Sequence, residues 1–95
     1  MMVVWTESAL ADLDEILAYT AEHYPTLIGS LERRIRAAVA RIADWPLSTR
    51  AVEERPGVRV VPLIRYPYRI FYRLTGETVE LLHIHHAARD ESPQP

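Results

Sequence analysis

The chain is 95 residues long and 48% of its residues are hydrophobic, which predicts one domain with one modest core. It contains no cysteine, so disulfides, thiol catalysis and cysteine-bound zinc are excluded. The net charge of −2 argues against a general nucleic-acid-binding protein, and all 11 basic residues are arginine.

The beginning of the chain predicts a strand and then a helix. Met2 to Trp5 is a short apolar run typical of an edge strand, and it lacks the pattern of a signal peptide. Thr6 is a suitable N-cap, and Glu7 places negative charge where the helix dipole favours it. Because Pro25 disfavours helix in the residue before it, this helix should end near His23. The helical face expected in the core consists of Leu10, Leu13, Leu17 and Tyr24, with Ile16 beside them.

A second helix should follow after a very short connection, with Thr26 as its cap and Pro46 as its stop. Its arginines lie away from an apolar stripe that has the three- and four-residue spacing of an amphipathic helix. The stripe consists of Leu31, Ile35, Ala38, Ile42 and Trp45. Two helices joined so tightly must form an antiparallel hairpin.

The second half of the chain predicts three strands. Residues 46–57 have the prolines and the glycine of a loop. The strands are expected at 58–64, 67–74 and 78–86, and a hairpin turn at 75–77 joins the last two. Pro62 removes one hydrogen-bond donor, so the first of these strands should lie at an edge or contain a bulge.

These elements give the order β-α-α-β-β-β and an α+β fold in a single domain over residues 1–95. Three consecutive strands joined by short turns form an antiparallel meander. The N-terminal strand and the helical hairpin should pack on this small antiparallel sheet, which leaves its other face for function. Residues 87–95 should form a flexible tail. No apolar run approaches the roughly 18 residues of a membrane span, so a cytoplasmic protein is expected.

Residues 66–73, Tyr-Pro-Tyr-Arg-Ile-Phe-Tyr-Arg, are the most strongly patterned stretch. Side chains of a strand alternate between two faces. The packing face would consist of Tyr68, Ile70, Tyr72 and Leu74. The opposite face would consist of Arg69, Phe71 and Arg73. Two arginines on one strand face predict contact with an anionic or polar partner.

Arginines are concentrated between residues 50 and 73, where six of them accompany only two glutamates. An arginine-rich codon usage would account for the lack of lysine but not for this clustering. Pairing with neighbouring acids is the alternative role of a surface arginine. Arg50 and Arg55 fit that role, since they flank Glu53 and Glu54. The other arginines of the segment are therefore candidates for a functional surface.

Histidines are the residues of this chain that exchange protons near neutral pH. His83 and His85 would point to one face of the last strand and His86 to the other. Zinc needs three or four ligands, and the sequence offers no evident third ligand beside His83 and His85, so no metal site is predicted. RNA cleavage needs proton transfer and positive charge at the phosphate, and His86 could exchange the proton while Arg89 supplies charge. A structural role for His86 near the sheet edge is the alternative.

Several short segments occur in a characteristic order and spacing between Trp5 and Asp90. They are Ala11–Ile16, Trp45-Pro46, Gly57–Arg59, Tyr66–Arg73 and His86–Asp90. Together with the element order, these segments resemble the RelE/ParE superfamily of toxins from bacterial type II toxin–antitoxin modules, over nearly the whole chain. The ending His-Ala-Ala-Arg is similar to the His-Gly-Ala-Arg of ParE-like members.

The resemblance implies one of two activities. RelE-like members cleave messenger RNA on the ribosome, whereas ParE-like members are similar in fold and inhibit DNA gyrase. Arg59, Arg69 and Arg89 match basic positions of the RelE-like pattern, and with His86 they would be the catalytic residues of an endoribonuclease. However, Val61 stands where that pattern has a second basic residue, and no tyrosine or histidine follows Arg89. These departures favour the ParE-like branch.

We therefore expect a non-enzymatic, ParE-like toxin that inhibits DNA gyrase and so blocks replication. The alternatives are a RelE-like ribosome-dependent endoribonuclease and an inactive toxin relic. The resemblance implies a ParD-like antitoxin in a hetero-oligomer, with DNA contacted only through the antitoxin. No cofactor, metal or membrane is expected. Clustered like charges are tolerated best beside an anionic partner. The residues expected to bind partners are Arg59, Arg65, Arg69, Arg73 and Arg89.

Overall fold

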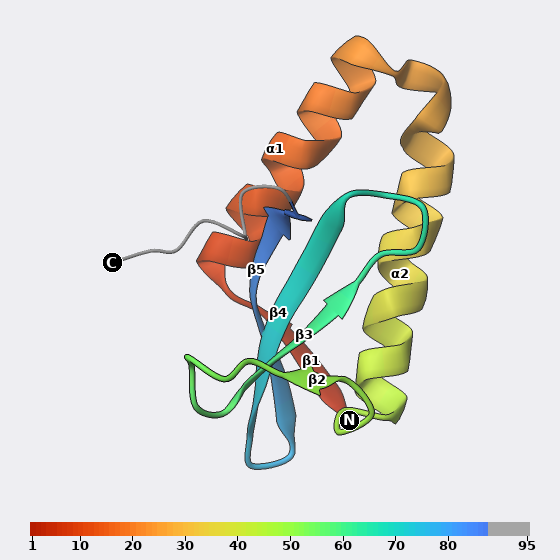
Figure 1. Ribbon diagram of the computed structural model, residues 1–95. Helices are drawn as coiled ribbons and strands as arrows, with labels where there is room; N and C mark the ends of the chain where they lie inside the picture. Colours follow the sequence, from red (N-terminus) through yellow and green to blue (C-terminus); the bar gives the residue numbers. More distant parts are fainter. Residues whose placement is uncertain (88–95) are drawn as a thin grey trace.

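A computed structural model describes residues 1–87 (Figure 1). The elements are β1 (Met2–Trp5), α1 (Glu7–His23), the 3-10 turn η1 (Pro25–Leu27), α2 (Ile28–Asp44), β2 (Arg50–Ala51), β3 (Val58–Pro62), β4 (Tyr68–Thr75) and β5 (Thr78–His86). The two helices form an antiparallel hairpin beside one sheet, so the expected α+β fold is confirmed (Figure 1). Neither helix is long and apolar enough to cross a membrane within the part of the chain that is described.

The five strands form one sheet in the order β1-β5-β4-β3-β2. Strands β3, β4 and β5 make the expected antiparallel meander. The first strand, β1, lies at the edge but pairs parallel to β5, so the sheet is mixed and not wholly antiparallel. The helical hairpin makes this possible, because it separates β1 from the meander and parallel neighbours need a long connection.

The segment between α2 and β3 contains a short strand where a loop was expected. In β2, Arg50 pairs with Val60 and Ala51 with Arg59. The outer edge of β3 would otherwise present unpaired backbone groups, and this pairing satisfies some of them. The turn chemistry of the segment did not reveal it, because two residues are too few to show an alternating pattern.

The main core lies between the helical hairpin and one face of the sheet. Its buried members are Ala9, Ile16, Leu31, Ile35, Ile42, Val61, Leu63, Ile70, Tyr72, Val79, Leu81 and Ile84, with Tyr68 and Leu74 packed against them. The expected packing face of β4 is therefore confirmed. A smaller cluster on the opposite face contains Val58, Val60 and Phe71, with Val52 and Leu82 packed against it.

Three residues assigned to the core from the helical patterns are exposed instead. Leu10 is 46% exposed, Tyr24 54% and Trp45 68%. The buried line of α1 runs through Ala9, Ile16 and Thr20, whose Oγ1 donates to the Ile16 carbonyl at 2.8 Å. The small side chains of Ala9 and Thr20 let the helix approach the sheet. Alanine and threonine are only weakly hydrophobic, so the apolar pattern of the sequence did not identify this line as the buried one.

The helix ends follow the sequence signals with one exception. Thr6 caps α1 by accepting a hydrogen bond from the Ala9 N–H at 3.2 Å, and α1 ends at His23 as expected. Thr26 does not cap α2, because it lies inside η1, and α2 begins at Ile28 without a side-chain cap. Pro25 fits the first position of such a turn, because a backbone N–H at that position would have no hydrogen-bond acceptor within the turn.

Candidate functional site

The face of the sheet away from the helices, here called the open face, carries arginines around an apolar centre. Arg69, Phe71 and Arg73 of β4 lie opposite Pro62, Val60 and Val58 of β3 in the register. The Arg55 guanidinium carbon lies 6.0 Å from the centre of the Phe71 ring, a cation–π contact. The open face is thus basic at its margins and apolar in the middle.

Arg59 does not belong to the open face. It lies opposite Tyr72, a core residue, in the pairing of β3 with β4. Its Nη1 donates to the Thr49 carbonyl at 2.5 Å and to the Leu47 carbonyl at 3.4 Å. The expected grouping of Arg59 with Arg69 is therefore wrong. Tyr72, the partner of Arg59, is three residues from Arg69 on β4, and side chains an odd number of residues apart on a strand project to opposite faces.

The contact of Arg59 is part of an anchor that holds the loop after α2 to the sheet. The fully buried Tyr72 donates its hydroxyl to the Pro46 carbonyl at 2.6 Å. The same hydroxyl is hydrogen-bonded to the Thr49 side chain. A buried tyrosine needs such partners for its hydroxyl, and here they fix the position of the loop.

Arg73 on the open face forms an ion pair with Glu80 of β5. Its Nε donates to Glu80 Oε1 at 2.7 Å, and Thr75 Oγ1 donates to the same oxygen at 3.2 Å. These hydrogen bonds, that of Arg73 first, lower the pKa of Glu80. Because the folded-state pKa is depressed, this stabilisation is present above the ordinary pKa of glutamate and is lost as pH falls through the folded-state value. Arg73 therefore offers less net charge to a partner than its exposure indicates.

Of the two remaining arginines of the expected site, the structure describes only Arg65. Arg65 is exposed in the connection from β3 to β4 and has a φ of 76°. This left-handed conformation is uncommon for residues other than glycine, and it is found often at functional sites. Arg89 lies outside the described residues, as do residues 88–95 of the expected tail.

The residues expected of a ribonuclease lie on both faces of the sheet. His86 is opposite Tyr68 in the register, and the two rings make an edge contact with centroids 5.5 Å apart. Tyr68 packs against the main core, so His86 and Arg59 share the helix-covered face whereas Arg69 lies on the open face. On that face Arg59 lies opposite Tyr72 and His86 lies opposite Tyr68. These two tyrosines are four residues apart on β4, which is about 13 Å along a strand.

A groove of 520 Å³ lies between α2 and the edge of the sheet at β3. Its lining contains four arginines and no acidic residue; these arginines are Arg34, Arg41, Arg50 and Arg69. The apolar part of the lining consists of Ala37, Ala38, Val60, Val61, Pro62, Leu63 and Ile64. Sequence analysis missed Arg34 and Arg41, although their spacing of seven residues places them on one side of a helix.

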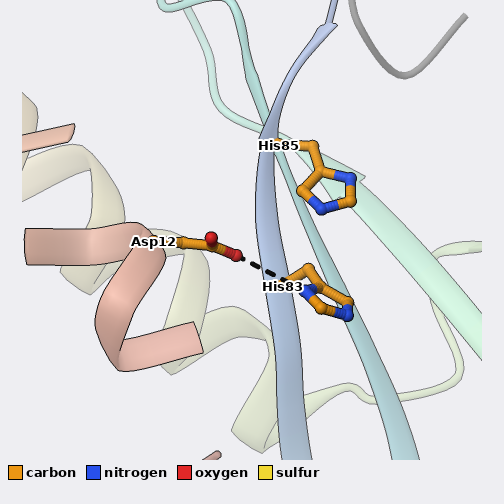
Figure 2. A group of neighbouring side chains, drawn as sticks. All are labelled: Asp12, His83 and His85. Atoms are coloured by element: carbon orange, nitrogen blue, oxygen red, sulfur yellow. Dashed lines mark ion pairs between the residues drawn. The ribbon is translucent and has the colours of Figure 1, made fainter. Parts of the chain in front are cut away.

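On the open face, His83 and His85 of β5 form a cluster with a carboxylate from α1 (Figure 2). One ligand atom from each of Asp12, His83 and His85 lies within 4.8 Å of the others. A bulge leaves Leu82 unpaired, since Phe71 pairs with His83 and Tyr72 with Leu81. His83 and His85 consequently lie on the face opposite to that of His86, as expected from the sequence. No pattern in the sequence predicts that Asp12 joins them.

The chain is thus a small α+β domain with a helical hairpin on one face of a mixed sheet, a basic open face and an arginine-lined groove. The chain matches the family described as the ParE toxin of the type II toxin–antitoxin system parDE over residues 3–91, and it belongs to this family. The resemblance to the RelE/ParE superfamily is thereby confirmed, and the protein is a toxin of a type II toxin–antitoxin system.

Individual relatives agree with this family. The toxin RelE2 of Caulobacter vibrioides is 35% identical over 91 residues, which cover 92% of this chain and 96% of that protein. The putative toxin Y4kP of Sinorhizobium fredii is 38% identical over 87 residues, which cover 87% of this chain and 84% of its own. A structure from the chromosomal ParDE system of P. aeruginosa superposes with a TM-score of 0.78 at 27% identity, covering 90% of this chain and 95% of the other.

Proposed function

We propose that this toxin acts in the cytoplasm by inhibiting DNA gyrase and does not cleave messenger RNA. The observation that carries the proposal is the separation of the ribonuclease residues: Arg59 and His86 are on the helix-covered face, and Arg69 is on the open face. RNA cleavage needs an acid, a base and positive charge around one phosphate. Within residues 1–87 these side chains do not surround a common point, which favours a toxin that acts by binding.

The groove between α2 and β3 is the binding site of a ParD-like antitoxin in a hetero-oligomer. Charge complementarity favours this partner, because the lining has four arginines and no carboxylate. The apolar lining includes Ile64, which is 62% exposed. A segment with apolar anchors and acidic side chains fits such a groove, whether it binds as a helix or as an extended strand. DNA is contacted through the antitoxin and not by this chain.

The surface that meets the target includes Arg69 and Arg73 of the open face and Arg65 at its margin. Arg89, which the sequence adds to this set, lies outside the described residues. Arg59 contributes indirectly, since its hydrogen bonds to the Leu47 and Thr49 carbonyls hold the loop after α2. Acidic residues of the antitoxin compete for part of this surface, because Arg69 also lines the groove. Neutralisation then follows from shared contacts and needs no conformational change.

Purified toxin should inhibit supercoiling by gyrase or trap its cleavage complex, because its proposed target is the enzyme and not RNA. Supercoiling of relaxed plasmid is the measurement, with the toxin–antitoxin complex as the inactive control. In parallel, translating ribosomes with a defined message should yield no toxin-dependent cuts. Codon-specific cleavage together with unaffected gyrase would overturn the proposal.

Replacement of Arg69 with alanine should weaken gyrase inhibition about tenfold, equivalent to about 1.4 kcal/mol, through loss of one charged contact. The loss of antitoxin affinity should be smaller, because the other arginines of the groove remain. Arg36→Ala is the matched control, since Arg36 is exposed on α2 and lines no part of the groove. If Arg69→Ala stays folded by circular dichroism and inhibits gyrase fully, the open face is not the working surface.

A further inference from the structure

We propose that Asp12, His83 and His85 form a binding site for zinc or a similar divalent transition metal. Figure 2 shows the Asp12 carboxylate directed from α1 toward His83, with His85 beside it on the same strand. Neutral imidazoles and a carboxylate are the ligands that zinc takes besides thiolate. The oxygen-rich surroundings that magnesium and calcium require are not offered by two imidazoles.

The distance between Asp12 and His83 is close to that of a tetrahedral centre, and His85 lies within reach of both. Asp12 Oδ2 and His83 Nδ1 are 3.5 Å apart. Two ligand atoms at about 2.0–2.1 Å from zinc are separated by about 3.3 Å when the angle is tetrahedral. The rings of His83 and His85 are 4.9 Å apart between centroids, and ligand atoms of all three residues lie within 4.8 Å. Rotation of the imidazoles about their side-chain torsions closes the remaining difference.

The backbone positions Asp12 for this role. Strand β1 pairs with β5 only as far as Trp5 and Leu81, so β5 continues beyond its parallel neighbour. The Ile84 N–H on that stretch donates to Asp12 Oδ2 at 2.9 Å. Hydrogen bonds to a ligating carboxylate are the usual means by which a protein orients it toward a metal. An ion pair of Asp12 with His83 is the competing role, and the experiment below separates the two.

The site is partly open to solvent. The side chains of His83 and Asp12 are 33% and 26% exposed, so an ion can enter without unfolding. Three protein ligands leave a fourth position for water or for a side chain of a partner. A bound metal would connect the first helix to the last strand, two elements at opposite ends of the sequence, and would stabilise the folded state by mass action. This site does not depend on the proposed inhibition of gyrase.

The full-length, untagged toxin should bind about one equivalent of Zn²⁺ after removal of metal with a chelator. Isothermal titration calorimetry measures the affinity, and Co²⁺ as a probe should give the visible absorption of a four- or five-coordinate ion. His83→Gln and His85→Gln should each weaken binding by more than about 100-fold, beyond the loss typical of an outer contact. Asp12→Asn should also weaken it, although asparagine retains an oxygen that can accept from the Ile84 N–H.

His86→Gln is the matched control, because His86 is on the same strand but the opposite face. It should bind Zn²⁺ like the parent, and the circular dichroism spectra of all variants should agree. The proposal is overturned if the parent shows no saturable binding, or if His86→Gln loses binding as strongly as the other histidine variants. Unchanged affinity in Asp12→Asn would also overturn it, because Asp12 would then serve only as the partner of Ile84 and His83.

Discussion

Replacing Ile35 with alanine should lower the free energy of unfolding by about 2–5 kcal/mol, a large share of the stability of a small domain. Ile35 is 4% exposed and belongs to the main core between the helices and the sheet. The loss combines the transfer of the removed methyl groups with the cavity left in a packed interior. The better helix propensity of alanine offsets only about half a kcal/mol. Urea unfolding followed by circular dichroism measures the change.

Leu10→Ala is the matched control for this prediction. Leu10 is 46% exposed, although the helical pattern of the sequence places it in the core. Its replacement should change the stability by about half a kcal/mol or less, as at other surface positions. Leu13, which is half-buried against the main core, should lie between the two. Equal losses for Ile35→Ala and Leu10→Ala would mean that the buried face of the hairpin is assigned wrongly.

The fold could be predicted from the sequence because local signals and global packing agree. The alternation of β4 gives the correct core face, and Thr6 and Pro25 define the ends of α1. The misplaced residues are those where apolar character and burial differ. Leu10 lies next to the buried stripe of α1, and a helical pattern does not distinguish a stripe from its margin. Trp45 lies beyond the end of α2 at Asp44, so the helical spacing no longer applies to it.

The candidate site was harder to predict from the sequence than the fold, because it depends on which side chains the sheet brings together. Arg59 has the same charge as Arg69, but only the register of β3 with β4 assigns them to opposite faces. Asp12 meets His83 because β1 is shorter than β5 and leaves an N–H for α1 to contact. Neither fact is encoded in spacing along the chain. In contrast, the position of Arg34 and Arg41 on one side of α2 was available from their periodicity.

Reversing the charge of Arg34 should weaken the binding of the cognate antitoxin about 100-fold, equivalent to about 2.8 kcal/mol. Arg34 is half-buried and lines the groove together with Arg41, Arg50 and Arg69. Arg34→Glu replaces an attraction for an acidic segment with a repulsion in a partly desolvated place, where screening by salt is weak. Surface plasmon resonance with immobilised antitoxin measures the affinity, and circular dichroism checks the fold.

Arg36→Glu makes the same charge change on the same helix, but Arg36 is exposed and outside the groove. Its effect on antitoxin affinity should stay within about threefold, as for a charge at the rim of an interface, and should fall further at high salt. A second step distinguishes direct contact from indirect effects. An antitoxin in which an acidic residue is replaced with arginine should bind Arg34→Glu more tightly than it binds the parent toxin. Equal affinity of Arg34→Glu and Arg36→Glu for the antitoxin would show that the antitoxin binds elsewhere, because a side chain inside the occupied groove cannot reverse its charge without cost.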